Sequence, residues 1–283
     1  MRFQYDGDKP ITNLEYPEFW DVKLTGRCGG TCPWCYMNST KDEPHYEGIT
    51  KKVLNFFGKM NENQRPFQIA YGGGNPNEHP EFRNVLWATY NLGILPNYTT
   101  NGMGVTKDVL LSTIAYCGGV AVSTHPHIPQ WRSAVESFHK LRSGILEETT
   151  CHCHLPTIGA RSPDLPKLRV NLHMIIEGRE SVMRAMTEFA EFKDKIDYFV
   201  LLPLTAQGRQ KDAQVDSKFL FDTIASLPQE DQRRFAYGAK FYEGLKEYGK
   251  LKVDLYEPEI MSKFLDLKDM KVYGSSFDLT RSM

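Results

Sequence analysis

The chain has 283 residues, of which 41% are hydrophobic and 24% charged, and its formal net charge is −1. This is the composition of a globular protein, and a charge so close to zero gives no bulk argument for a nucleic-acid or membrane surface. No apolar run approaches the roughly 20 residues of a membrane span, and Met1–Pro10 has no signal-peptide core, so we expect a cytoplasmic protein without membrane contact.

Short β-rich runs alternate with segments of helical periodicity. The predicted strands are Trp20–Thr25, Phe67–Tyr71, Tyr98–Thr100, Gly119–Ser123, Leu168–Ile176 and Tyr198–Leu204. The predicted helices are Thr50–Met60, Glu81–Leu92, Lys107–Tyr116, Trp131–Leu141 and Glu180–Phe192. Such alternation predicts βαβ units and a parallel sheet. Because six units are fewer than the eight of a closed barrel, the predicted fold is α/β: a partial (β/α)6 TIM-like barrel with a lateral opening and a short α/β C-terminal extension.

Three segments are predicted: an N-terminal extension (1–17), the barrel (18–210), and a C-terminal extension (211–283) that covers or completes the barrel. The elements expected in the last segment are strands at Phe235–Tyr237 and Lys252–Tyr256 and a helix at Lys240–Tyr248. The connection Ser143–Lys167 is too long for an ordinary loop, which suggests a functional one. It contains the tract Cys151-His-Cys-His154, a candidate for a second metal or auxiliary cluster.

Three of the six cysteines, Cys28, Cys32 and Cys35, lie in one turn directly after the first predicted strand. In a chain of this length they are not a disulfide framework, and clustered cysteines in a reducing compartment indicate metal binding or catalysis. Iron–sulfur clusters that only carry electrons have four thiolate ligands, so three thiolates leave one iron open for chemistry. A zinc site with a distant fourth ligand, such as His79 or His125, is the alternative.

The triplet, with the aromatic Trp34 just before its third cysteine, resembles the signature of the radical S-adenosylmethionine (SAM) superfamily. The resemblance covers about residues 18–210. It implies a [4Fe-4S] cluster on Cys28, Cys32 and Cys35, and SAM bound to the open iron. Reductive cleavage of SAM would then give a 5′-deoxyadenosyl radical that abstracts hydrogen from a substrate. An electron donor such as flavodoxin or ferredoxin is implied as a partner.

The resemblance also implies SAM contacts after the successive strands. Gly72-Gly73-Gly74-Asn75-Pro76 is similar to the family's Gly-Gly-Glu-Pro turn, with Asn75 in place of the glutamate. Thr99-Thr100-Asn101-Gly102 looks like the family's Thr-Asn-Gly turn. The fifth strand is similar to a family pattern at Ile175 but departs from it at His173. The full set of expected SAM contacts is Trp34, Tyr36, Gly73, Gly74, Asn75, Thr100, Asn101, Ser123, His173, Ile175 and Leu204, the last shortly before Gln207-Gly208-Arg209.

The substrate stays open at this point. Cys35-Tyr36 and the glycine turn favour a peptide or protein, whereas the lack of cysteines after Cys153 argues against the peptide-modifying branch with a C-terminal cluster domain. A nucleotide or a small metabolite is the alternative substrate. A non-catalytic Fe–S or zinc protein with a decayed SAM site, of which Asn75 would be the sign, is the alternative function.

Overall fold

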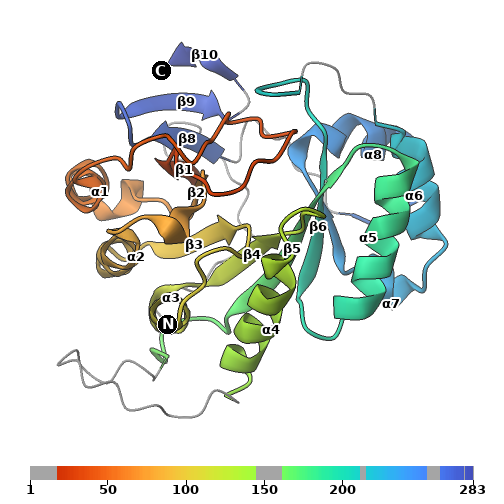
Figure 1. The fold of residues 1–283 in the computed structure, drawn as a ribbon, viewed down its shortest axis with the longest axis horizontal. Coiled ribbons are helices and arrows are strands. Elements are labelled where there is room, and N and C mark those ends of the chain that lie inside the picture. Colours follow the sequence, from red (N-terminus) through yellow and green to blue (C-terminus); the bar gives the residue numbers. More distant parts are fainter. Residues whose placement is uncertain (1–17, 145–160, 211–214, 254–261, 277, 283) are drawn as a thin grey trace.

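In the computed structural model, the described residues are 18–144, 161–210, 215–253, 262–276 and 278–282. They form one sheet of ten strands in the order β10-β9-β8-β1-β2-β3-β4-β5-β6-β7, and Figure 1 shows helices along its outer side. The strands are β1 (Phe19–Thr25), β2 (Gln68–Gly73), β3 (Leu95–Thr100), β4 (Gly119–Ser123), β5 (Arg169–Ile176), β6 (Tyr198–Pro203), β7 (Phe235–Tyr237), β8 (Ser262–Asp266), β9 (Lys271–Ser275) and β10 (Asp278–Ser282).

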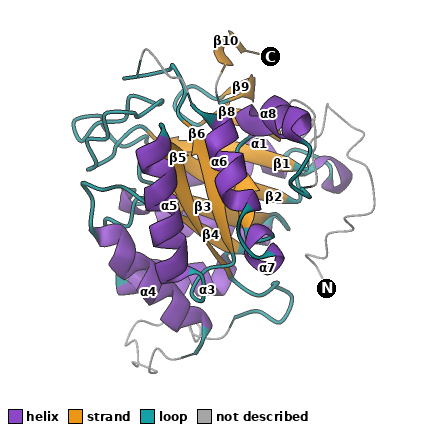
Figure 2. Ribbon diagram, turned by 90° about the vertical axis from the view of Figure 1, so that its right-hand side faces the viewer, coloured by secondary structure: helices purple, strands orange, loops and turns teal. Residues whose placement is uncertain are grey.

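Strands β1 to β7 pair in parallel, each with the next in the chain, and a helix connects each of the first five pairs. The α-helices are α1 (Ile49–Gly58), α2 (Phe82–Asn91), α3 (Lys107–Tyr116), α4 (Gln130–Arg142), α5 (Arg179–Phe192), α6 (Ser217–Ala225), α7 (Gln229–Gln232) and α8 (Tyr242–Tyr248). Figure 2 shows the strands from a second side, behind α5 and α6. The predicted fold class, an α/β partial barrel, is confirmed.

The two faces of the sheet carry different side chains. Outward-facing residues such as Val22, Ile69 and Leu201 are fully buried and form the core with the helices. The alternate residues face the other side and include the polar Asp21, Gln68 and His173. Strand alternation therefore places polar groups on the inner face beneath the carboxyl ends of the strands, where a parallel barrel places its active site.

The predicted elements agree with the observed ones except at one strand and in the tail. Strand β3 begins at Leu95 rather than Tyr98, because Pro96, which has no N–H to donate, joins the sheet by accepting a hydrogen bond from Gly118 N at 3.0 Å. Strands β8, β9 and β10 were not predicted. β8 lies parallel to β1, and β9 and β10 follow antiparallel.

The strand predicted at Lys252–Tyr256 is wrong for its first two residues, which are irregular, and the rest of it lies outside the described residues. The predicted helix at Lys240 is a 3-10 turn, Ala239–Phe241, followed by α8. The N-terminal extension and the Cys151–His154 tract also lie outside the described residues, and the three segment boundaries stay predictions. No helix that the structure describes combines the length and apolarity needed to cross a bilayer.

The contact between α1 and β1 gives a test of the core. Phe57 is fully buried and meets Trp20 edge-to-face, with ring centroids 5.5 Å apart. We expect Phe57→Ala to lower the free energy of unfolding by about 3–5 kcal/mol, because it leaves a cavity at the base of the cysteine loop's strand. On the same helix Leu54 is 38% exposed, so Leu54→Ala should cost less than about 1 kcal/mol. Urea unfolding followed by circular dichroism measures both, and equal losses would contradict this packing.

Candidate functional site

The cysteine loop runs from the end of β1 to the start of α1 and is folded by its own backbone. Cys28 N donates to Thr40 O at 2.9 Å and Thr40 N to Gly26 O at 3.3 Å, which closes the loop at its base. Within it, Cys35 N donates to Cys32 O at 3.3 Å. All three cysteines are free thiols, so the loop that follows β1 carries three sulfur atoms able to bind metal.

Burial shapes the chemistry of these thiols. It raises the pKa of Cys32 to about 12, and the neighbouring cysteines raise it further. Burial also raises the pKa of Cys28, with Glu78 and Cys35 adding to the rise. The two thiols therefore hold their protons at neutral pH until a metal binds and releases them.

Two residues after neighbouring strands hold the first cysteine. Glu78, just past β2, accepts a hydrogen bond from Gly29 N through Oε2 at 3.2 Å. Asn101, just past β3, donates from Nδ2 to Cys28 Sγ at 3.4 Å. A donor on a ligating sulfur is one of the means by which a protein sets the reduction potential of an iron–sulfur cluster.

The loop after β6 also fixes the cysteine loop in place. Arg209 donates from its backbone N to Cys35 O at 3.2 Å, from Nη1 to Cys32 O at 2.7 Å, and from Nη2 to Ser39 O. Gly208 makes this approach possible: its φ is +70°, and a Cβ there would collide with the carbonyl oxygens of Cys35 and Tyr36. The sequence contains Gly208-Arg209 a few residues after the end of a strand, but no function was predicted for either residue.

This donor set fits a cluster better than a single ion. Across the described ranges, no three His, Cys, Asp or Glu side chains lie close enough to hold one metal ion. His79, one proposed zinc ligand, has both ring nitrogens engaged: Nε2 with Tyr46 O at 2.8 Å, and Nδ1 with Glu81 N at 3.0 Å. Three free thiols in one loop are the donor set that a cubane with one open iron requires.

Asn75 has a structural role. It is 1% exposed, and its Oδ1 accepts from Thr100 Oγ1 at 3.0 Å and from Asn101 N at 3.3 Å. Its Nδ2 donates to Glu78 Oε1 at 2.8 Å and to Met103 O at 3.0 Å. Both polar atoms of the amide thus join the turns after β2 and β3, and the predicted contact of Asn75 with SAM stays a prediction.

The glycine turn is packed on one side and open on the other. A Cβ on Gly74 would collide with Arg27 O, and Gly73 has a φ of +101° and accepts from Ser39 Oγ at 3.2 Å. Gly72, in contrast, has open space where a side chain would be. Only glycine lets the turn touch the cysteine loop and still leave room on the inner face.

Trp34 and Tyr36 lie on different sides of the cysteine loop. Trp34 packs near His125 and His127, with ring centroids 6.0 and 5.5 Å away, and its buried Nε1 has no hydrogen-bond partner among the described residues. Within the same ranges, the buried Nδ1 of His125 has no partner either. The phenol of Tyr36 bonds to Ser276, and burial raises its pKa. Orphaned polar atoms such as these mark places where a ligand or water is expected.

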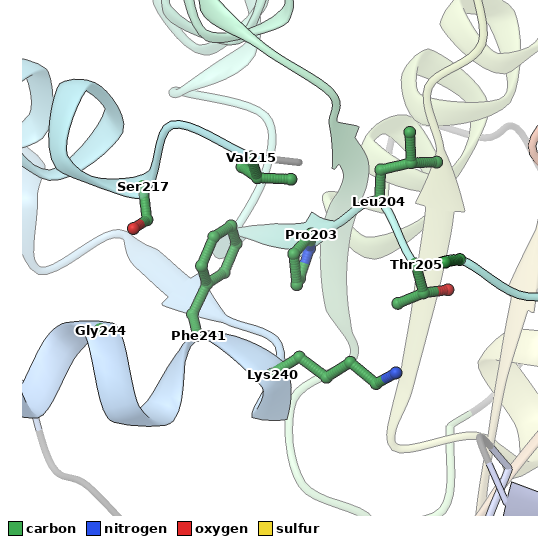
Figure 3. Close-up of a pocket in the computed structure, with 9 residues that line it drawn as sticks. Pro203, Leu204, Thr205, Val215, Ser217, Lys240, Phe241 and Gly244 are labelled. Atoms are coloured by element: carbon green, nitrogen blue, oxygen red, sulfur yellow. The ribbon is translucent and has the colours of Figure 1, made fainter. Parts of the chain in front are cut away.

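The remaining expected SAM contacts lie on the carboxyl halves of β4 to β6. Ser123 pairs in register with His173, and burial lowers the pKa of His173 to about 4, so its ring is neutral at pH 7. Ile175 lies further along the same face of β5 as His173. Leu204 follows β6 and lines a cavity of about 290 Å³ with Pro203, Thr205, Val215, Ser217, Lys240, Phe241 and Gly244 among its other lining residues (Figure 3).

No family model and no curated protein matches the sequence. Solved structures do match the fold. SuiB of Streptococcus suis bound to S-adenosylmethionine has a TM-score of 0.66 at 12% identity, over 95% of this chain and 63% of SuiB. SuiB bound to its precursor peptide SuiA gives 0.63 at 14% identity, over 95% and 62%. The protein anSMEcpe with bound AdoMet and the Cp18Cys peptide gives 0.59 at 13%, over 92% and 74%. The chain thus shares their fold and spans less than two thirds of SuiB.

The Arg209 contacts predict that this residue holds the cysteine loop in place. We expect Arg209→Gln to lower the free energy of unfolding of the metal-free chain by about 1–3 kcal/mol, because buried carbonyls lose a charged donor. After anaerobic reconstitution the variant should retain less iron per chain. Arg179→Gln is the matched control, since Arg179 is 71% exposed on α5. Full iron retention by Arg209→Gln would show that the cysteine loop binds iron without the hydrogen bonds of Arg209.

The hydrogen bonds of Asn75 predict the effect of restoring the family's glutamate. In Asn75→Glu a second carboxylate would face Glu78, and the donors to Glu78 and Met103 would be lost. We expect a loss of about 1–3 kcal/mol in the free energy of unfolding and no tighter SAM binding. The exposed Asn91→Glu change on α2 is the control. Tighter SAM binding by Asn75→Glu, measured by equilibrium dialysis, would mean that the turn opens toward SAM.

Proposed function

We propose that this protein is a radical SAM enzyme whose [4Fe-4S] cluster is held by Cys28, Cys32 and Cys35. The observation that supports it most is a set of hydrogen bonds that fix the cysteine loop. They come from the segments after β2, β3 and β6, at the carboxyl end of a parallel partial barrel. SuiB and anSMEcpe, which share this fold, were both solved with S-adenosylmethionine bound.

When bound, the reduced cluster supplies the electron that cleaves SAM to methionine and a 5′-deoxyadenosyl radical, which takes a hydrogen atom from the substrate. The chain's own residues prepare the site for this chemistry. Arg209 and Glu78 fix the loop, so that the thiols meet the metal without reorganisation. Asn101 donates to Cys28 Sγ and thereby shifts electron density away from the cluster.

SAM would lie along the carboxyl ends of the strands. Gly73 and Gly74 would offer backbone carbonyl groups to its amino group, and Thr100 and Asn101 complete the wall beside them. The residues proposed for its nucleoside and carboxylate are Trp34, Tyr36, Ser123, His173, Ile175 and Leu204. Because both polar atoms of Asn75 are bonded within the protein, we propose that it shapes this turn and does not itself bind SAM.

We propose a peptide or protein as the substrate. SuiB was solved with its precursor peptide SuiA, and anSMEcpe with the Cp18Cys peptide. A nucleotide or a small metabolite is the alternative substrate. Flavodoxin or ferredoxin is the proposed electron donor, and the reducing cytoplasm is the proposed compartment, because the described thiols are free.

A non-catalytic Fe–S protein is the second candidate function, and one observation favours it: Asn75, at the position of the family's SAM-binding glutamate, is fully engaged within the protein. Under anaerobic reduction with dithionite, a radical SAM enzyme releases 5′-deoxyadenosine from SAM, whereas a chain that has lost its SAM site releases none. This one measurement separates the two candidates.

The cluster assignment predicts the effect of removing one thiol. We expect Cys32→Ala to lose the absorbance near 400 nm, the iron of the cluster and all 5′-deoxyadenosine release, because two protein thiolates do not hold the cubane. Cys117→Ala is the matched control: Cys117 is also a free, buried thiol, but it lies at the end of α3 and should leave all three readouts intact. Continued SAM cleavage by Cys32→Ala would refute the assignment.

A further inference from the structure

One charged side chain on the inner face of the sheet is unmatched. Asp21 lies midway along β1, between Trp20 and Val22, which are buried on the outer side. Its carboxylate faces inward and is reached by solvent. The surrounding protein nevertheless raises its pKa to about 6, so that it is charged at neutral pH.

Two neighbouring polar groups of this face have partners within the protein. Lys23, the next inward residue of β1, forms an ion pair with Asp266 at 2.8 Å. Gln68 accepts from Asn97 Nδ2 at 3.0 Å. Asp21 has no hydrogen bond or ion pair with any residue described, and its one charge interaction is with the phenol of Tyr36, whose pKa it helps to raise. Surroundings that raise the pKa of a carboxyl group and supply no counter-charge favour a cation that arrives from outside.

The space around Asp21 is kept clear. Its register partner on β2 is Ala70, and two residues further along β2 Gly72 faces open space. On the other side its register partner on β8 is Phe264, which offers no hydrogen bond. No two further acidic, His or Cys side chains lie close enough to make Asp21 part of a metal site in the described chain. The lone carboxylate therefore suits an organic cation.

We propose that Asp21 binds a positively charged group of the substrate, an ammonium or a guanidinium, on the inner face below the cysteine loop. The inference rests on the proposed function and adds to it the substrate class: a molecule with a basic group, such as a lysine or arginine side chain of a peptide. Asp21 lies midway along β1, whereas the turns proposed to hold SAM follow the strand ends, and we therefore assign this charge to the substrate.

The test uses the reconstituted, reduced holoenzyme with SAM and four blocked tripeptides, acetyl-Ala-Xaa-Ala-amide, in which Xaa is Lys, Arg, Gln or Glu. We expect the lysine or the arginine peptide to raise 5′-deoxyadenosine release, and Asp21→Asn to lower that stimulation about tenfold, as loss of a charged hydrogen bond would. Asp108→Asn is the matched control, because Asp108 is paired with Arg83 on the outer surface. Lack of stimulation by both cationic peptides, equal stimulation by all four, or an unaffected Asp21→Asn variant would overturn the proposal.

A second measurement needs no turnover. Since the pKa of Asp21 is raised on folding, its ionisation destabilises the folded chain as pH rises from about 4 to about 6. The melting temperature of Asp21→Asn minus that of the wild type should therefore grow over this interval and stay constant above it. A flat difference would show that Asp21 already has a partner and would overturn the proposal. If the wild type releases no 5′-deoxyadenosine at all, the proposed function fails, and this measurement still decides whether Asp21 is an unmatched charge.

Discussion

The arrangement of this site depends on how a loop without regular secondary structure is held above the sheet. A short thiol-bearing turn that moved freely would lose much entropy on binding a metal. Here the turn loses this conformational entropy when the chain folds, because Arg209, Glu78 and Asn101 fix it from three strand ends. Parallel strands bring all their carboxyl ends to one edge, so residues far apart in the chain can share this task.

The same constraint explains which parts of the site could be read from the sequence. Cys28, Cys32 and Cys35 are local, and their spacing and Trp34 are visible without a fold. Arg209 is not, because its contacts with Cys32 and Cys35 form only when β6 lies in the same sheet as β1. Gly208-Arg209 after a strand end was the available signal, since a glycine there allows close backbone approach, but nothing in the sequence said what it would approach.

Strands and helices were predictable where their signal is local in the sequence. Runs such as Gly119–Ser123 and Lys107–Tyr116 carry their own periodicity, and both agree with β4 and α3 residue for residue. Strand β8 has five residues, and what defines it is its pairing with β1, more than 200 residues away in the chain. The hydrogen bonds of Asn75 were hidden for the same reason: its type and position match a family turn, but its four partners are brought to it only by the fold.

Charge balance links the loop to the inner face of the sheet. Lys23 could have neutralised Asp21, two residues away on the same strand face, but β8 supplies Asp266 for it instead. The C-terminal strands therefore do more than widen the sheet. Because Asp266 of β8 pairs with Lys23, Asp21 is left without a counter-charge among the described residues beneath the site. Because the neighbouring lysine is already paired, the charge of Asp21 discriminates between substrates: a neutral substrate would leave the carboxylate desolvated, and an anionic one would be repelled.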